Sequence, residues 1–177
     1  DIYYEDRGTF GQIVANLQPM DKWSLALALD DPSLVDRDLP VDLFRIFQTV
    51  NEGASQIFAK FIADHPKLVE SSIAYIVASL RFPMENGPLV IRLLLESEFQ
   101  AIALQQIIYN LKRTITEHKS QRFIRYLVDS GYFWNIIDVI YQAGDYKVLR
   151  DLSNWMLVNN NMDFQEISRE MRKMVPK

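Results

Sequence analysis

The stretch "PLVIRLLLESEFQAIALQQIIYNLKR", residues 88–113, decides the fold. It is apolar enough to be buried, yet too polar to cross a membrane, because it lacks the roughly 18 consecutive apolar residues of a spanning helix. The same periodicity recurs elsewhere. In "DLFRIFQTV", residues 42–50, apolar side chains fall three and four positions apart and so share one helical face. No stretch alternates strictly enough to predict a strand.

A second stretch repeats the layout of the first. "GYFWNIIDVIYQAGDYKVLRDLSNWMLVNN", residues 131–160, also begins with Gly, continues as an apolar helix, breaks, and ends in a longer helix. Leu89, Val90, Leu93 and Leu94 correspond to Ile136, Ile137, Ile140 and Tyr141 at an offset of 47 residues, and Asn110 corresponds to Asn154 at an offset of 44. A weaker third copy covers 42–65. Periods of about 40–47 residues are typical of armadillo and HEAT arrays.

Turn residues divide the chain into short, closely spaced helices. Gly131 and Gly144 stand where left-handed C-caps are expected, and Asp145 and Asp163 stand where side chains cap the next helix. The predicted helices lie near 9–17, 21–30, 40–52, 54–65, 66–82, 88–97, 98–116, 119–130, 132–143, 145–159 and 163–174. So many helices with such short connections favour a helical solenoid over a four-helix bundle.

At these residues the chain resembles the armadillo family of helical repeats. Residues 119–159 match its three-helix unit, and 88–113 match the second and third helices of the preceding unit. The resemblance implies an all-α fold, a right-handed α-solenoid of armadillo/HEAT-like repeats in a single domain over 1–177. Within it, 1–40 would be an irregular or capping region, 41–159 the repeats, and 160–177 a C-terminal capping helix.

The resemblance also nominates binding residues. In the armadillo family, Asn side chains of the third helices bind the backbone of an extended peptide in a concave groove, which nominates Asn110 and Asn154. Helical spacing adds Gln106 and Arg113 beside Asn110, and Arg150 and Asp151 beside Asn154. The alternative is that each Asn only bonds to a neighbouring turn. Trp155, at a position usually filled by Leu, is expected to belong to the core.

The aromatic run Tyr132, Phe133, Trp134 poses a packing problem. Adjacent residues on a helix point about 100° apart, so the three rings cannot all face one core. We expect at least one of them to be exposed or to lie between repeats. Packing between repeats is favoured over an interface anchor.

Composition argues against catalysis. The chain has no Cys, which excludes a disulfide framework, a thiolate metal site and a cysteine nucleophile, and fits a reducing compartment. His65 and His118 are far apart at helix boundaries, where solvent-facing caps are expected, and no metalloprotease, phosphate-loop or nucleophile-elbow motif occurs. We expect no catalytic residue, cofactor or metal.

The expected function is a non-enzymatic scaffold for protein–protein interaction, binding a peptide or helix of a partner on its concave or end surface. Because the sequence lacks an initiator Met, a fragment of a larger protein or complex subunit is expected, intracellular in the cytoplasm or nucleus, with no membrane contact. Oligomerisation through the apolar end of the array is a minor alternative.

A basic segment, 112–125, suggests an RNA-binding helical repeat instead. Its possible patch consists of Lys112, Lys119, Arg122 and Arg125. The net charge of −4 disfavours nucleic acid, because affinity for phosphates depends on many cations. Residues 1–70 hold 12 acidic and 6 basic residues, whereas 71–177 hold 11 acidic and 13 basic ones. Solvated helix faces explain the basic segment equally simply.

Overall fold

The computed structural model describes residues 19–35, 55–84, 86–117, 121–159 and 161–176. These ranges contain only helices, turns and short connections, and no strand. The helices are α3 (Pro19–Leu29), the 3-10 helix η1 (Pro32–Leu34), α5 (Ser55–Asp64), α6 (Pro66–Glu70), α7 (Ile73–Ser79), α8 (Gly87–Leu95), α9 (Gln100–Glu117), α10 (Arg122–Asp129), α11 (Phe133–Gln142), α12 (Tyr146–Val158) and α13 (Met162–Met174). The all-α prediction is confirmed for these residues, while the helices predicted near 9–17 and 40–52 lie outside them.

One predicted helix was wrong. Residues 66–82 form two helices, α6 and α7, separated at Ser71 and Ser72. The Ser71 hydroxyl donates to the carbonyl of Leu68 at 3.0 Å, and such a local side-chain bond competes with the next turn of helix. The consequence is a change of direction between two short helices where a single long one was expected.

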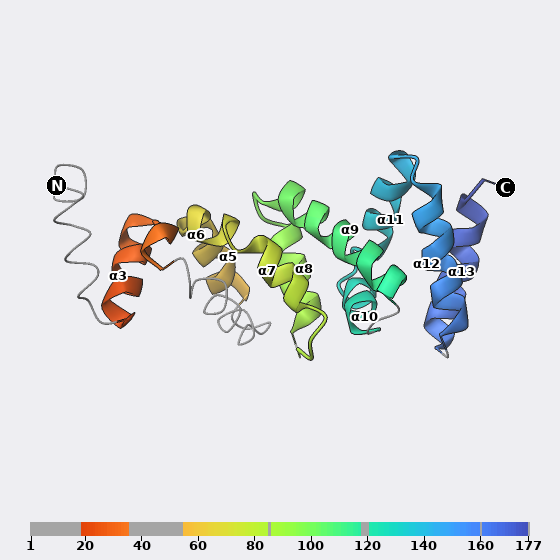
Figure 1. Ribbon diagram of the computed structural model, residues 1–177, viewed down its shortest axis with the longest axis horizontal. Coiled ribbons are helices and arrows are strands. Elements are labelled where there is room, and N and C mark those ends of the chain that lie inside the picture. Colours follow the sequence, from red (N-terminus) through yellow and green to blue (C-terminus); the bar gives the residue numbers. More distant parts are fainter. Residues whose placement is uncertain (1–18, 36–54, 85, 118–120, 160, 177) are drawn as a thin grey trace.

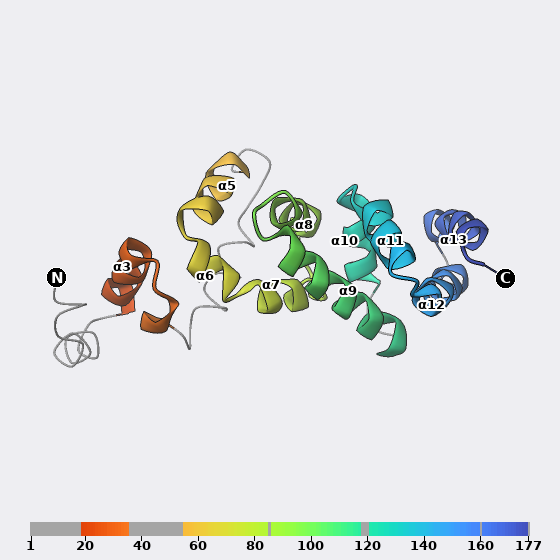
Figure 2. The same cartoon turned by 90° about the horizontal axis from the view of Figure 1, so that it is seen from above.

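The helices follow one another along the long axis of the molecule in chain order, from α3 to α13 (Figure 1). Seen from above, α7, α9 and α12 lie along one side of the stack, and α8, α10, α11 and α13 lie along the other (Figure 2). Helix α9 packs against both α7 and α12. The three helices therefore follow one another along this side in the order in which they occur in the sequence. Their side of the stack carries the cavities described below.

A continuous apolar core joins the elements. Its fully buried members come from every part of the stack and include Leu68, Ile76, Leu94, Ile107, Phe123 and Phe164. Trp155 is 7% exposed and belongs to this core, as predicted. Because the core residues fall at helical spacing within each element, each helix buries one stripe against its neighbours.

Several hydrogen bonds between separate helices span similar lengths of chain. The Asp30 carboxylate accepts from the backbone N–H groups of Lys67 (3.0 Å) and Leu68 (3.2 Å), 37 and 38 residues away, and so caps α6. Further bonds join Tyr126 to Met84 over 42 residues, Tyr132 to Glu96 over 36, and Arg125 to Asp163 over 38. Each fastens one part of the stack to the next.

The two predicted glycine C-caps are present in the structure, whereas the two predicted aspartate N-caps are not. Gly131 and Gly144 have φ of +83° and +73°, which confirms the left-handed C-caps. The Asp145 side chain makes no capping bond, because its carboxylate pairs with Lys112 at 3.1 Å. Helix α13 is capped by Asn161, whose side chain accepts from the N–H groups of Asp163 and Phe164. The capping roles predicted for Asp145 and Asp163 were therefore wrong.

The aromatic run divides as predicted. Phe133 is buried, Trp134 is 40% exposed, and Tyr132 lies between α11 and α8, where its hydroxyl donates to Glu96 Oε1 at 2.8 Å. This hydrogen bond, followed by burial and the charge of Glu96, raises the pKa of Tyr132. No helix in the described ranges is long and apolar enough to cross a membrane.

Candidate functional site

A groove of about 420 Å³ lies between α9 and α12. Its apolar floor consists of Ile115 and Trp155, Val158 forms its apolar end, and its polar edge consists of Thr116, Lys147, Asp151 and Asn154. The volume falls in the range of about 300–1,000 Å³ that is common for ligand-binding pockets.

Helical geometry explains why these residues meet. On α12, positions 151, 154, 155 and 158 follow position 147 by four, seven, eight and eleven residues. This spacing places all five on one face of the helix. That face carries polar side chains in its first two turns and apolar ones at its end. Val158 is 81% exposed, so the apolar end of the groove is open to solvent.

The polar edge of the groove is organised by two contacts. Lys147 Nζ pairs with Asp151 Oδ2 at 2.7 Å, one turn apart on α12. Asn154 is exposed, and its Oδ1 accepts from Arg172 Nη2 of α13 at 3.3 Å. The Asn154 amide nitrogen makes no hydrogen bond within the described residues, so this side chain can still donate to a ligand.

Asn110 has a different environment. Together with Arg113 it lines a cavity of about 20 Å³ between α7, α9 and α10, which is room for about one water molecule. The Asn110 amide donates to the carbonyl of Gln106 at 2.8 Å, within its own helix. Arg113 Nε pairs with Glu117 at 3.3 Å. The Asn110 amide nitrogen and Arg113 Nε are therefore engaged by α9 itself.

Four of the six nominated residues thus separate into two groups. Asp151 and Asn154 share the large groove, and Arg150 lies exposed on α12 one turn before Asn154. Asn110 and Arg113 share the small cavity, and Gln106 lines neither of the two. The two asparagines are consequently not equivalent, although their sequence contexts are similar.

The predicted basic patch is partly neutralised. Lys112 pairs with Asp145 at 3.1 Å, and Arg125 pairs with Asp163 at 3.4 Å and with Asp129 at 4.0 Å. Arg125 also lies over the ring of Phe164, 5.4 Å from its centroid. Arg122 is exposed, and Lys119 lies outside the described residues. Positive charge in this region mostly faces carboxylates of the same chain.

Sequence reasoning missed Ile115, Thr116, Lys147 and Val158, which line the groove, and Arg172, which bonds to Asn154 at its edge. A signal existed for two of them: Val158 and Lys147 continue the stripe of Asp151 and Asn154 at four-residue spacing. Ile115 and Arg172 come from other helices, and only tertiary packing brings them there. Trp155 serves the core and the floor of the groove together.

His65 departs from the prediction of a solvent-facing cap. It holds the N-cap position of α6, but it is half-buried, with its ring 4.8 Å from that of Phe61. Its Nδ1 is buried without a hydrogen-bond partner among the residues that the structure describes. Over those same residues, no cluster of three His, Asp or Glu side chains could hold a metal ion. His118 lies outside the described ranges.

No family model, curated protein or solved structure matches the chain. The function of the groove has to be inferred from its own residues and their contacts.

Proposed function

We propose that the chain is a non-catalytic protein-interaction module that binds a peptide or helix of a partner in the groove between α9 and α12. The groove itself carries the proposal: about 420 Å³ of space with an apolar floor and an exposed amide at its edge. An amide suits this task because it offers both donors and an acceptor to a peptide backbone. The open apolar end at Val158 would supply the buried contact that gives affinity.

The fold we propose is a right-handed α-solenoid of armadillo/HEAT type. Two observations support it. The helices stack in chain order, and several of the bonds between them join residues 36 to 42 positions apart, close to the repeat length of such arrays (Figure 1). Helix α13 would be the capping helix, since its exposed side chains are mostly charged: Asp163, Glu166, Arg169, Glu170, Arg172 and Lys173.

The RNA-binding alternative has less support. Of its four basic residues, Lys112 and Arg125 already face carboxylates, and the whole chain has a net charge of −4. Phosphate binding depends strongly on the number of free cations. The lack of Cys supports the further proposal of an intracellular protein, in the cytoplasm or nucleus, acting as a subunit of a larger assembly.

A matched pair of valine variants tests the groove. Peptides are selected from a random displayed library against the 177-residue chain, and their Kd values are measured by fluorescence anisotropy. Val158→Ser removes an apolar contact at the groove without adding charge, and we expect it to weaken binding about tenfold, since a buried Val contributes about 1.5 kcal/mol. Val139→Ser is the control, because Val139 is 40% exposed on α11 and does not line the groove.

Both valines are exposed, so neither change should alter the helical circular dichroism or the melting temperature measurably. Equal weakening by the two variants would place the peptide elsewhere. Failure to select any peptide, or full binding by Val158→Ser, would contradict the proposed function.

A further inference from the structure

We propose that the groove selects an acidic segment: a carboxylate of the bound peptide lies at Arg150 and Arg172, while a neighbouring apolar side chain lies on Ile115, Trp155 and Val158. This inference rests on the proposed function and adds the chemistry of the partner. It comes from the distribution of charges around the groove.

The cations at the groove edge fall into two kinds. Lys147 pairs with Asp151, and Lys112, on α9 one turn before Ile115 and Thr116, pairs with Asp145. Arg150 and Arg172, in contrast, have no carboxylate partner within the part of the chain that the structure describes. Both side chains are exposed. Beside the groove, α12 and α13 therefore carry two positive charges that the described chain leaves uncompensated.

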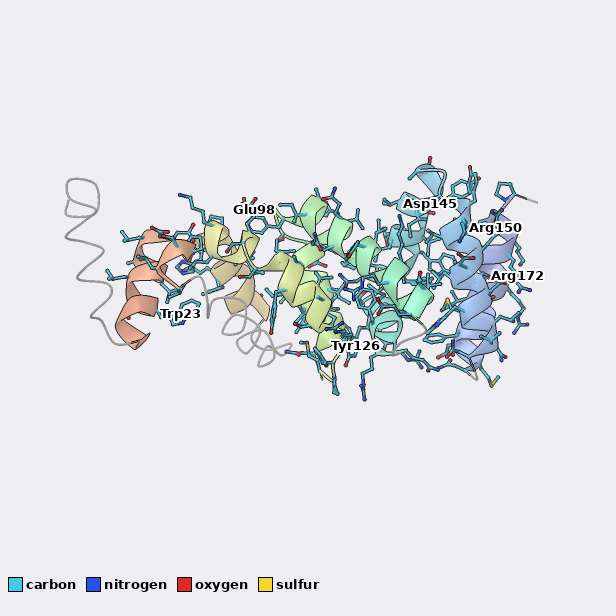
Figure 3. The ribbon with its side chains drawn as sticks, viewed as in Figure 1. Trp23, Glu98, Tyr126, Asp145, Arg150 and Arg172 are labelled. Atoms are coloured by element: carbon cyan, nitrogen blue, oxygen red, sulfur yellow. The ribbon has the colours of Figure 1, made fainter. Side chains whose placement is uncertain are left out.

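The two arginines flank the same point of the groove. Arg172 Nη2 lies 3.3 Å from Asn154 Oδ1, and Asn154 lines the groove. Arg150 precedes Asn154 by four residues on α12, and residues at this spacing are neighbours on a helix surface. Figure 3 shows Arg150 and Arg172 on the adjacent helices α12 and α13. A ligand contacting the Asn154 amide would thus meet both guanidinium groups.

Guanidinium groups bind carboxylates through paired N–H donors, which makes arginine well suited to this recognition. An RNA phosphate could meet the same charges. The floor of the groove favours a peptide, because Trp155 is only 7% exposed and cannot offer an open ring face for stacking with a base. Aliphatic contact with Ile115 and Val158 suits apolar side chains of a peptide instead.

Three labelled synthetic peptides of one length test the inference on the full chain. The first alternates Asp with Leu, the second replaces every Asp by Asn, and the third replaces every Asp by Lys. We expect the Asp peptide to bind about tenfold more tightly than the Asn peptide at low salt, as two exposed ion pairs together contribute about 1.4 kcal/mol. This preference should shrink as salt is raised, because exposed charges are screened.

Charge reversal supplies the decisive comparison. Arg150→Glu and Arg172→Glu should each weaken the Asp peptide, and the double variant should prefer the Lys peptide. Lys60→Glu is the control: it makes the same charge change at an exposed residue of α5, at the other end of the stack, and should leave the order of the peptides unchanged. Circular dichroism verifies that each variant keeps its helices.

The outcomes separate the two proposals. If all three peptides bind equally and Val158→Ser weakens each of them, groove binding stands and the acidic preference is overturned. If Val158→Ser changes none of the affinities, the proposed function fails as well. If a single-stranded RNA oligonucleotide binds more tightly than the Asp peptide and loses its affinity in the arginine variants, the partner is nucleic acid and the inference is wrong.

Discussion

Gly87 and Tyr126 lie so close together that a side chain at position 87 would clash with the Tyr126 ring. Gly87 opens α8, and a Cβ added there would lie 2.6 to 2.8 Å from three carbon atoms of the Tyr126 side chain. The ring is held in place because its hydroxyl accepts a hydrogen bond from the N–H of Met84 at 2.8 Å. The lack of a side chain at this position is what lets α10 approach the start of α8.

We expect Gly87→Ala to lower the free energy of unfolding by about 1–3 kcal/mol, the usual cost of overpacking. Tyr126→Ala removes the ring, so adding Gly87→Ala to that variant should cost nothing further. Urea denaturation of the two single variants and the double variant measures this coupling. A neutral Gly87→Ala in the otherwise unchanged protein would show that the ring moves aside freely.

At the scale of single helices, the sequence predicts existence, approximate limits and the glycine C-caps well, but it assigns the N-caps of α12 and α13 wrongly. Asp145 has the right type and position for a cap, yet Lys112 of α9 engages its carboxylate. Asp30 caps α6 from 37 residues away. Both outcomes depend on which helix lies alongside, and that information is absent from local sequence.

The same limit applies to the groove. Helical spacing alone is enough to group Arg150, Asp151 and Asn154. It does not show that Asn110, in a similar context, turns its amide to the carbonyl of Gln106. The difference comes from the gaps between helices: about 20 Å³ beside Asn110 and about 420 Å³ beside Asn154. Gap sizes are set by packing of side chains from several helices.

The hydrogen bond from Tyr132 to Glu96, which joins α11 to α8, predicts that the free energy of unfolding depends on pH. We expect Tyr132→Phe to cost less than about 1 kcal/mol, because the hydrogen bond to Glu96 is exposed to solvent. The raised pKa of Tyr132 in the folded protein means that its contribution is complete below the unfolded value of about 10. The contribution is then lost as pH rises through the folded pKa.

Urea denaturation of the Tyr132→Phe variant and the unchanged protein tests this dependence. The difference in unfolding free energy should stay constant at neutral pH and close in the alkaline range. A difference that persists after tyrosine ionisation would assign it to packing and not to the hydroxyl.

At the scale of the whole molecule, α13 closes the apolar core at one end. Phe164 and Met171 are buried, the Phe164 ring lies 6.0 Å from that of Trp155, and Ser153 and Ser168 exchange buried hydrogen bonds across α12 and α13. The outer face of α13 is charged. A polar outer face of this kind keeps the end of a helical stack from associating with other molecules.

Removal of residues 161–177 should therefore expose Trp155 and the apolar face of α12. We expect the shortened chain to elute early or aggregate in size-exclusion chromatography, with red-shifted tryptophan fluorescence. Full-length chains carrying Glu166→Ala and Arg169→Ala, both on the exposed face, should elute as the unchanged protein does. Normal elution of the shortened chain would show that the apolar face of α12 does not need to pack against α13.

The order of helices along the stack follows from the sequence because self-similarity and turn residues mark each element. The break of 66–82 at Ser71 does not, since serine is tolerated within many helices and only its bond to Leu68 reveals the turn. Hydrophobic spacing therefore predicts where the helices lie in the sequence, whereas their directions in space depend on tertiary contacts.

The hydrogen bonds described between helices of the stack span 15 to 42 residues of chain. Closing loops of this length costs little more entropy than closing shorter ones. None of these contacts requires segments from opposite ends of the chain to meet. Assembly can start from any pair of adjoining helices and spread outward. Amide hydrogen exchange should accordingly be slowest in α8 to α11, which pack against other helices on both flanks, and faster toward α13.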